Sequence, residues 1–175
     1  MVLGNGNTLV CFDKFGQVRD FYFPYVGQEN HIGSNQMHKI GVFVDNKMNW
    51  ISSGEWNVDI RYERNSMVSK MTALNERTKV LVESTDVVYN EKNIFLRKIT
   101  LTNKDSRARN IKIFLNQQFK IGDTNHADTA YFSSTIESII HYKGRRVFLV
   151  GGMCDNKPFD DYSIGFCGIE GKEGT

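Results

Sequence analysis

The sequence has few cysteines and no arrangement of them that would build a disulfide framework. Cys11, Cys154 and Cys167 are an odd number without Cys-x-x-Cys spacing. They predict reduced thiols in a cytoplasmic protein and exclude a pattern typical of a zinc site. Because no nucleophile motif surrounds any of them, we expect no catalytic cysteine.

The chain also lacks an excess of charge and any long apolar run. Its 22 lysines and arginines against 20 aspartates and glutamates leave a net charge of +2. That is too small to indicate binding to nucleic acid or to an anionic membrane. No apolar stretch approaches the ~20 residues that span a bilayer, and the N-terminus shows no signal peptide. At 175 residues the chain has the size of one domain.

Prolines are scarce too: there are 2, whereas 15 glycines separate many short runs rich in Val, Ile, Phe and Tyr. In residues 57–63, Val58, Ile60 and Tyr62 alternate with charged side chains, and residues 38–45 and 93–103 behave similarly. A further strand is predicted at 110–121, whose buried face consists of Ile111, Ile113, Leu115, Phe119 and Ile121. A period of two over many segments predicts half-buried β-strands.

The segments between these runs have the composition of hairpin turns. Residues 12–18, FDKFGQV, place Asp13 and Gly16 where a four-residue turn built on a type I conformation needs them. Other turn sequences separate strand pairs at 45–48, 102–109 and 142–146. Strands at this spacing without intervening helices indicate an all-β protein, an antiparallel β-sandwich.

One segment, SSTIESIIHY at 133–142, is compatible with either a helix or a strand. Ser134 and Glu137 have the spacing of a capping box, and the isoleucines that follow have helical spacing. The segment is short and runs into a turn at Gly144, so we favour a strand. The C-terminal residues 168–175 form a polar, glycine-rich segment typical of a linker or a truncated chain.

Candidate catalytic acids are present, but none lies in a motif. Glycosidases need two carboxylates at a defined separation, and the candidates here are Asp13, Asp20, Glu29, Asp160 and Asp161. Turns or solvated strand faces account for Asp13, Asp160 and Asp161 more simply. Glu29 differs because its neighbours are aromatic or carry amides.

Metal and phosphate sites are not indicated either. Residues 122–132 offer Asp123, His126 and Asp128, yet His-x-Asp alone is a weak metal signal and hydrogen bonding within a loop explains these residues better. The glycine-rich LGNGN at 3–7 lacks the spacing of phosphate-binding loops and leads into no helix. We therefore expect no metal and no cofactor.

Residues 22–31, YFPYVGQENH, break every simple period. In one interpretation Pro24 ends a strand and the segment is only a corner of the fold. The core is then filled by Phe21, Phe23 or Val26. In the other interpretation the segment binds sugar, because aromatic rings stack on pyranose faces and amides bond hydroxyls. Composition leaves both interpretations open.

A family resemblance adds to this interpretation. Residues 3–31, followed by HKIGVFVDNKMNWI at 38–51 and by Trp56, resemble the N-terminal domain of prokaryotic glucoamylase-like proteins of glycoside hydrolase family 15. Stretches near 128–152 are similar too, so the resemblance covers essentially the whole chain. It implies a large antiparallel β-supersandwich, followed in the family by a catalytic barrel of helical hairpins that hydrolyses terminal α-linked glucose with inversion.

The resemblance implies that residues 1–175 are a single N-terminal β-sandwich domain that is inactive by itself, because the two catalytic glutamates of the family lie in the helical domain. The family's sandwich is usually longer, so the last strands are expected to be missing. The expected partner is the catalytic domain of the same polypeptide, with an α-glucan or oligosaccharide at the junction. The residues expected to contact the catalytic domain or the saccharide are Tyr22, Tyr25, Gln28, Glu29, Asn30 and His31.

Two other functions remain open: a stand-alone carbohydrate-binding module and a purely structural sandwich. A binding module should expose coplanar aromatic rings, whereas a docking domain should expose a larger apolar patch. Trp50 and Trp56 are the candidates for a sugar platform, but we expect both in the core. The substrate linkage, whether in a maltooligosaccharide, an isomalto-linked glucan or trehalose, is not determined by the sequence.

Overall fold

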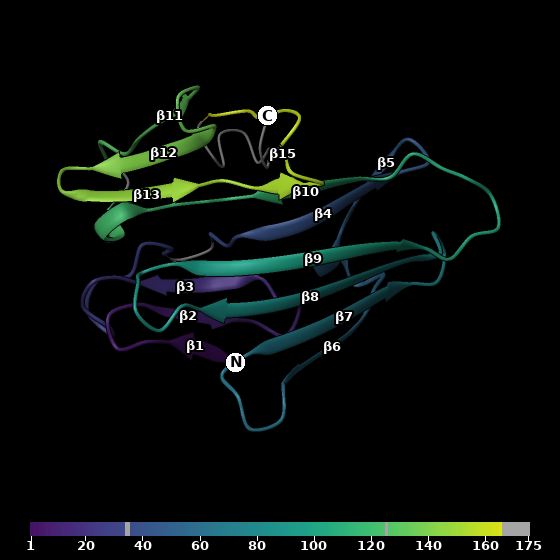
Figure 1. Cartoon of the computed structure of the whole chain (residues 1–175), viewed down its shortest axis with the longest axis horizontal. Coiled ribbons are helices and arrows are strands. Elements are labelled where there is room, and N and C mark those ends of the chain that lie inside the picture. The colour runs from purple at the N-terminus through teal and green to yellow at the C-terminus, as the bar shows by residue number, and fades with distance from the viewer. Residues whose placement is uncertain (34–35, 125, 166–175) are drawn as a thin grey trace.

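The computed structural model describes residues 1–33, 36–124 and 126–165. This part of the chain contains fifteen strands and two 3-10 helices of three residues each (Figure 1). Every strand pair in it is antiparallel. The prediction of an all-β, sandwich-type fold is confirmed. Residues 168–175 and Cys167 lie outside the described residues.

The strands follow one another without an α-helix in the described ranges. They are β1 (Val2–Gly4), β2 (Leu9–Phe12), β3 (Val18–Tyr22), β4 (Lys39–Val44), β5 (Lys47–Trp50), β6 (Asn57–Tyr62), β7 (Ser69–Asn75), β8 (Val80–Val88), β9 (Phe95–Asn103), β10 (Lys112–Asn116), β11 (Thr129–Ser133), β12 (Ser138–Lys143), β13 (Arg146–Val150), β14 (Met153–Cys154) and β15 (Lys157–Pro158). The 3-10 helices are η1 (Ile51–Ser53) and η2 (Ile121–Asp123).

Two sheets face each other across the main core. The four-stranded sheet β6-β7-β8-β9 lies opposite the three-stranded sheet β10-β4-β5. The sheet β1-β2-β3 lies beside the first of these, and the sheet β11-β12-β13 lies beyond the second (Figure 1). Alternation along β7 and β8 sends every second side chain inward, which is the pattern of strands buried on one face.

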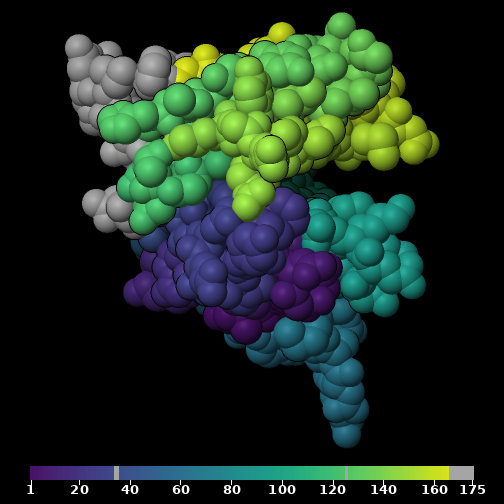
Figure 2. All heavy atoms as spheres, turned by 90° about the vertical axis from the view of Figure 1, so that its left-hand side faces the viewer, coloured from purple at the N-terminus to yellow at the C-terminus, as the bar shows by residue number. Residues whose placement is uncertain are grey.

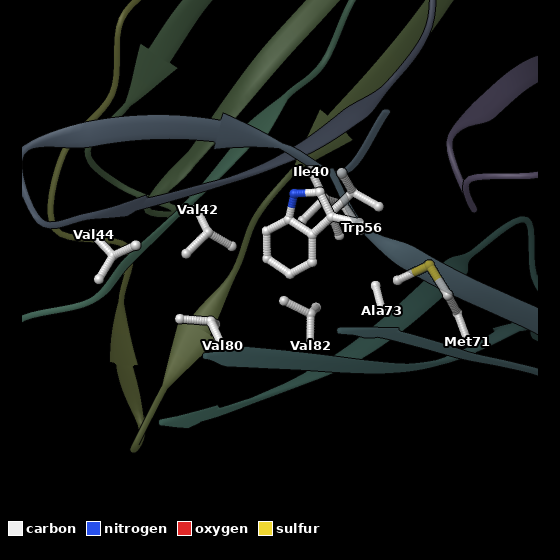
Figure 3. Close-up of a cluster of buried hydrophobic side chains, with 9 residues drawn as sticks. Ile40, Val42, Val44, Trp56, Met71, Ala73, Val80 and Val82 are labelled. Carbon is white, nitrogen blue, oxygen red and sulfur yellow. The ribbon is translucent and has the colours of Figure 1, made fainter. Parts of the chain in front are cut away.

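The main core is made of aliphatic side chains from the two facing sheets. Figure 3 shows Val42 and Val44 of β4 above Val80 and Val82 of β8, with the Trp56 ring beside them. Each of these side chains is nearly or fully buried. Burying one such aliphatic side chain contributes about 1.5–3 kcal/mol, so this cluster holds the two layers together.

A second cluster joins the sheet β1-β2-β3 to the end of β8. Leu3, Val10, Val18 and Ile32 pack there against Val88. Because residue 32 follows the segment 22–31 directly, this cluster anchors the far side of that segment in the fold.

A buried ion pair links β8 to β9. Asp86 is fully buried and accepts hydrogen bonds from Arg97 Nε at 2.8 Å and Nη2 at 2.9 Å, and from the Ser69 hydroxyl at 3.1 Å. Arg97 also donates to the carbonyl of Gly16 at 2.9 Å and lies over the ring of Phe12. The pair therefore fastens the 12–18 turn to β8 and β9.

Most of the predicted strands are confirmed. β4, β6 and β9 lie within the predicted ranges 38–45, 57–63 and 93–103. In the 12–18 turn, Asp13 accepts backbone hydrogen bonds from Phe15 at 2.8 Å and Gln17 at 2.9 Å, and Gly16 has a φ of 72°. These bonds within the turn are the ones its composition predicts.

The ambiguous segment 133–142 is a hairpin and not a helix. β11 ends at its first residue, a turn follows, and β12 begins at Ser138. Glu137 has a φ of 47°, a left-handed conformation that a helix does not allow. The strand prediction is confirmed for the second half, whereas the first half is a turn.

Residues 110–121 do not form the single half-buried strand that their period predicts. β10 covers only part of the range, and Ile113 and Leu115 remain 37% and 47% exposed because β10 is the outermost strand of its sheet. Beyond β10 the chain leaves the sheet, and the Lys120 N–H donates to the carbonyl of His31 at 2.8 Å. Backbone pairing with another segment thus ends the strand.

The two tryptophans differ. Trp56 is 6% exposed and lies in the main core, as predicted. Trp50 does not: its partner in the ladder is Gly41, and the neighbouring Ile40 and Val42 point into the core, so Gly41 and Trp50 face the other side of the sheet. A Cβ on Gly41 would lie 2.9 Å from the Trp50 ring. The ring therefore occupies the space beside Gly41 and is half-buried.

Candidate functional site

The segment 22–31 folds back on β3 as a short hairpin. Tyr22 and Asn30 form an antiparallel bridge, and the N–H of His31 donates to the carbonyl of Phe21 at 2.9 Å. The chain reverses through a turn in which Gly27 has a φ of 82°. The side chains divide the hairpin into an inner and an outer half.

Asn30 belongs to the inner half. Its Oδ1 accepts hydrogen bonds from the N–H groups of Phe21 at 3.0 Å and Ile32 at 3.1 Å, and its Nδ2 donates to Asp20 at 2.8 Å. Asn30 thus links the two arms of the hairpin, a structural role that side-chain amides fill in turns.

His31 is also part of the inner half and is fully buried. Its Nδ1 accepts the N–H of Gly122 at 3.2 Å, so Nε2 carries the ring proton and donates to the carbonyl of Phe23. Burial lowers the pKa of this histidine, which agrees with a neutral ring. Nδ1 therefore holds the hairpin to the segment around Gly122, and Nε2 ties the two arms of the hairpin together.

Glu29 connects the hairpin to a distant part of the chain. Its carboxylate accepts two hydrogen bonds from Arg146, from Nε at 2.7 Å and from Nη2 at 2.8 Å. The bond from Arg146 lowers the pKa of Glu29. Arg146 begins β13, so this bidentate pair connects the hairpin to the sheet β11-β12-β13.

Aromatic rings strengthen the same connection. Phe148 of β13 lies 4.8 Å from the ring of His31, 4.9 Å from that of Phe119 and 5.7 Å from that of Phe21, measured between ring centroids. Such pairs contribute about 0.5–1.5 kcal/mol each beyond the area that they bury. The inner face of the sheet is therefore packed firmly against the hairpin.

The outer half of the hairpin faces an open cavity of about 560 Å³. Tyr25 is 57% exposed there, and Gln28 is exposed beside it. The residues that line the cavity are Gly6, Asn7, Phe23, Pro24, Tyr25, Val26, Gln28 and Asn93. Figure 2 looks onto this end of the molecule, where the teal residues near 90 adjoin the purple N-terminal residues. None of the lining residues carries a charge.

Hydrogen bonds fix the wall of the cavity opposite the hairpin. Asn5 donates from Nδ2 to the carbonyls of Tyr89 at 2.8 Å and Lys92 at 3.0 Å. The Thr8 hydroxyl donates to Oδ1 of Asn93 at 3.2 Å. The turn at residues 5–8 and the loop at 89–94 are therefore held together although they are far apart in sequence.

The structure brings together only some of the predicted site residues. Tyr25 and Gln28 line the cavity, whereas Tyr22 is half-buried and does not line it. Glu29, Asn30 and His31 are engaged inside the chain, as described above. Whether any of the six contacts a partner domain or a sugar stays a prediction.

Sequence reasoning missed the three lining residues outside the segment 22–31 and one anchor. In the sequence, Gly6 and Asn7 belong to a glycine-rich stretch without the spacing of a phosphate-binding loop, and Asn93 begins a predicted strand. Arg146 pairs with Glu29 across 117 positions, for which the sequence contains no signal. The polar turn composition of NGN at 5–7 was the signal that could have drawn attention to this wall.

The remaining acidic candidates have structural roles or lie in solvent. Asp128 accepts the N–H of Ile121 at 3.0 Å, which confirms loop hydrogen bonding for that residue. Asp160 and Asp161 are exposed. The described residues contain no group of three or more His, Cys, Asp or Glu that could hold a metal ion.

The described cysteines and helices add no further site. Cys11 is buried, and burial raises the pKa of its thiol, which disfavours the reactive thiolate. Cys154 is exposed. Neither 3-10 helix in the described ranges is long and apolar enough to cross a membrane.

A relative is known for almost the whole chain. An uncharacterized glycosyl hydrolase of Methanocaldococcus jannaschii is 23% identical over 164 residues, which are 94% of this chain and 25% of that protein. This chain is similar to part of a glycosyl hydrolase. It spans about a quarter of the length of that relative. No protein-family model matches the chain, and no solved structure matches it.

Proposed function

We propose that this chain is a non-catalytic β-sandwich domain of a glycoside hydrolase, which packs on the catalytic domain of the same polypeptide and helps to shape its active site. The similarity to a much longer glycosyl hydrolase over nearly the whole chain supports the enzyme class. The resemblance of residues 3–31 to glucoamylase-like proteins of glycoside hydrolase family 15 supports the finer assignment, hydrolysis of terminal α-linked glucose by the parent enzyme.

An exposed apolar face carries the docking part of the proposal. In the register of the sheet β11-β12-β13, Tyr131, Ile140 and Leu149 form one rung, and Tyr142 and Val147 belong to the next rung on the same side. Leu149 is 61% exposed and Val147 49%. An antiparallel sheet with one solvated face normally carries polar side chains there. An apolar face of this kind is typical of a surface that another protein segment covers.

The outer face of β6-β7-β8-β9 provides the contrast within the same molecule. There the residues that line a shallow polar groove include Arg61, Lys70, Glu83 and Lys98. The outer face of β6-β7-β8-β9 thus carries charged and polar side chains, whereas the β11-β12-β13 face exposes apolar ones. The difference supports a docking role for the β11-β12-β13 face.

The apolar face lies on the side of the sheet β11-β12-β13 that points away from the hairpin 22–31. Arg146 and Phe148 contact the hairpin, and along β13 they alternate with Val147 and Leu149 of the apolar face. We further propose that Tyr25 and Gln28, which are exposed on the outer half of the hairpin, lie at the edge of the domain junction, and that Tyr22, Glu29, Asn30 and His31 shape the hairpin behind them. A sugar platform built on the tryptophans is less favoured, because Trp56 is buried and Trp50 is half-buried.

Leu149→Lys in the full-length polypeptide tests the docking role. The variant should lower activity several-fold and lower the melting temperature of the full-length protein, because a charge is buried at the junction. The melting temperature of residues 1–175 alone should stay unchanged, since Leu149 is mostly exposed. Thr100→Lys, on the polar outer face of β9, is the matched control. Equal behaviour of the two variants in the full-length protein would contradict the proposal.

A further inference from the structure

We propose that the cavity between the turn at 5–8, the outer half of the hairpin 22–31 and Asn93 binds an uncharged saccharide. The proposal deepens the proposed function, on which it rests for the choice of an α-linked glucose unit as the ligand. The site itself is defined by the side chains of this chain and can be tested without a partner domain.

The polar groups of the cavity match hydroxyl groups. Asn7, Gln28 and Asn93 contribute three primary amides to the lining, and each amide offers both donors and an acceptor. A sugar hydroxyl likewise donates and accepts. Since the lining contains no lysine, arginine, aspartate or glutamate, a charged ligand such as a phosphate or a carboxylate would find no counter-ion there.

The apolar groups of the cavity match the C–H face of a pyranose ring. Tyr25 exposes more than half of its surface, and Phe23, Pro24 and Val26 line the cavity beside it. A tyrosine offers an apolar ring face together with one polar tip. A mixed lining of this kind, with a volume of about 560 Å³, lies within the range of small-molecule sites, about 300–1,000 Å³.

The walls are held in place before any ligand binds. The hairpin is fixed by the turn bond from the Gln28 N–H to the Tyr25 carbonyl at 3.0 Å and by the Glu29–Arg146 pair. The opposite wall is fixed by Asn5, and Thr8 holds the Oδ1 of Asn93, which sets the plane of that amide. Walls that are already ordered reduce the entropy that binding must remove.

A titration of residues 1–175 with maltose, isomaltose or trehalose, followed by backbone amide chemical shifts, tests the site. We expect saturable shift changes at residues 5–8, 23–28 and 92–94 with at least one of the three sugars. Tyr25→Ala or Gln28→Ala should weaken the affinity about three- to tenfold. Tyr131→Ala is the matched control, because Tyr131 is also about half exposed, at 48%, but belongs to β11. It should leave the affinity unchanged.

The proposal is overturned if no sugar produces saturable shifts, or if Tyr131→Ala weakens binding as much as Tyr25→Ala does. Equally strong binding of glucuronate in place of the neutral sugars would also overturn it. These outcomes are distinct from failure of the docking role, which Leu149→Lys tests in the full-length polypeptide. If a sugar binds but Leu149→Lys has no effect on the full-length protein, the sugar site is supported and the docking role is rejected.

Discussion

His38 is almost completely buried, and the positive charge of Arg97 near it disfavours protonation of its ring. Burial, followed by the charge of Arg97, lowers the pKa of His38 from 6.5 to about 3, and His141 lies near enough to act in the same direction. The His38 ring also packs edge-on against Phe119, with ring centroids 4.7 Å apart. The native state therefore keeps this histidine neutral well below pH 6.5.

His38 should make the domain less stable in acid. Between pH 6.5 and about 3 the unfolded chain binds a proton at this position and the native chain does not. The free energy of unfolding therefore falls as the pH falls, by at most about 1.4 kcal/mol per pH unit for one histidine. Urea unfolding from pH 7 to 4 measures the slope. His38→Gln should flatten it, whereas His126→Gln, at an exposed loop position, should not. A slope that His38→Gln leaves intact would refute this assignment.

Asp86 should be the most costly carboxylate to remove from the described residues. It is fully buried, and its partner Arg97 would be left inside the fold without a counter-ion. Loss of one member of a buried pair costs about 3–5 kcal/mol. We expect Asp86→Ala to lower the free energy of unfolding by that amount in urea titration. Asp59→Ala, which removes an exposed partner of Arg61, should have little effect. Similar losses for both variants would argue against the buried pair.

At the scale of elements, the hairpin 22–31 and the sheet β11-β12-β13 stabilise each other. Among the described residues, the sheet β11-β12-β13 contributes no side chain to either of the two hydrophobic clusters. The aromatic contacts of Phe148 and the Glu29–Arg146 pair join the sheet to the hairpin. The position of the outer half of the hairpin, and with it one wall of the cavity, therefore depends on a strand more than a hundred positions away.

Arg146→Gln should loosen the hairpin. The variant loses both bonds to Glu29, so we expect several-fold faster amide hydrogen exchange at residues 25–29 and a rise in the pKa of Glu29 toward its ordinary value. The stability that this pair adds is present above the ordinary carboxyl pKa, and it is lost as the pH falls through the lowered one. Exchange and carboxyl titration by nuclear magnetic resonance measure both effects. Arg145→Gln, one position earlier in the β12–β13 turn, should change neither. Unchanged exchange in Arg146→Gln would show that the aromatic contacts suffice.

At the scale of the whole molecule, the chain is the size of one domain, and nearly all of it is similar to about a quarter of a longer glycosyl hydrolase. Inverting glycosidases place an acid and a base about 6.5–9.5 Å apart across the substrate. The cavity at the hairpin is lined by amides and aromatic rings without a carboxylate. Its composition suits binding and gives it no group for acid–base chemistry.

Residues 1–175 alone should therefore release no glucose from maltooligosaccharides. A reducing-sugar assay at pH 5 to 7 measures this, with the full-length polypeptide as the positive control. Turnover by the isolated chain that disappears when one of its own carboxylates is replaced would contradict the proposed function. If the full-length protein also releases no glucose from maltooligosaccharides, the result would instead indicate a different substrate linkage.

The sequence by itself determined the elements whose causes are local. The alternation in 57–63 and 93–103 and the turn at Asp13 depend on neighbouring residues, and the strands and turn are found where these patterns place them. The same reasoning failed where a distant segment decides the outcome. In residues 110–121 the alternation runs on, but the backbone leaves the sheet to pair with His31.

Only the tertiary structure decided which side each residue faces and which segments meet. Trp50 is a large apolar residue of the kind expected in a core, but its pairing with Gly41 places it on the side of the sheet that faces away from the main core. The cavity combines the turn at 5–8, the hairpin and Asn93, and Glu29 finds Arg146 across 117 positions. Periodicity and turn chemistry act over a few residues, whereas ring packing and ion pairs between distant segments form only once the sheets are in place.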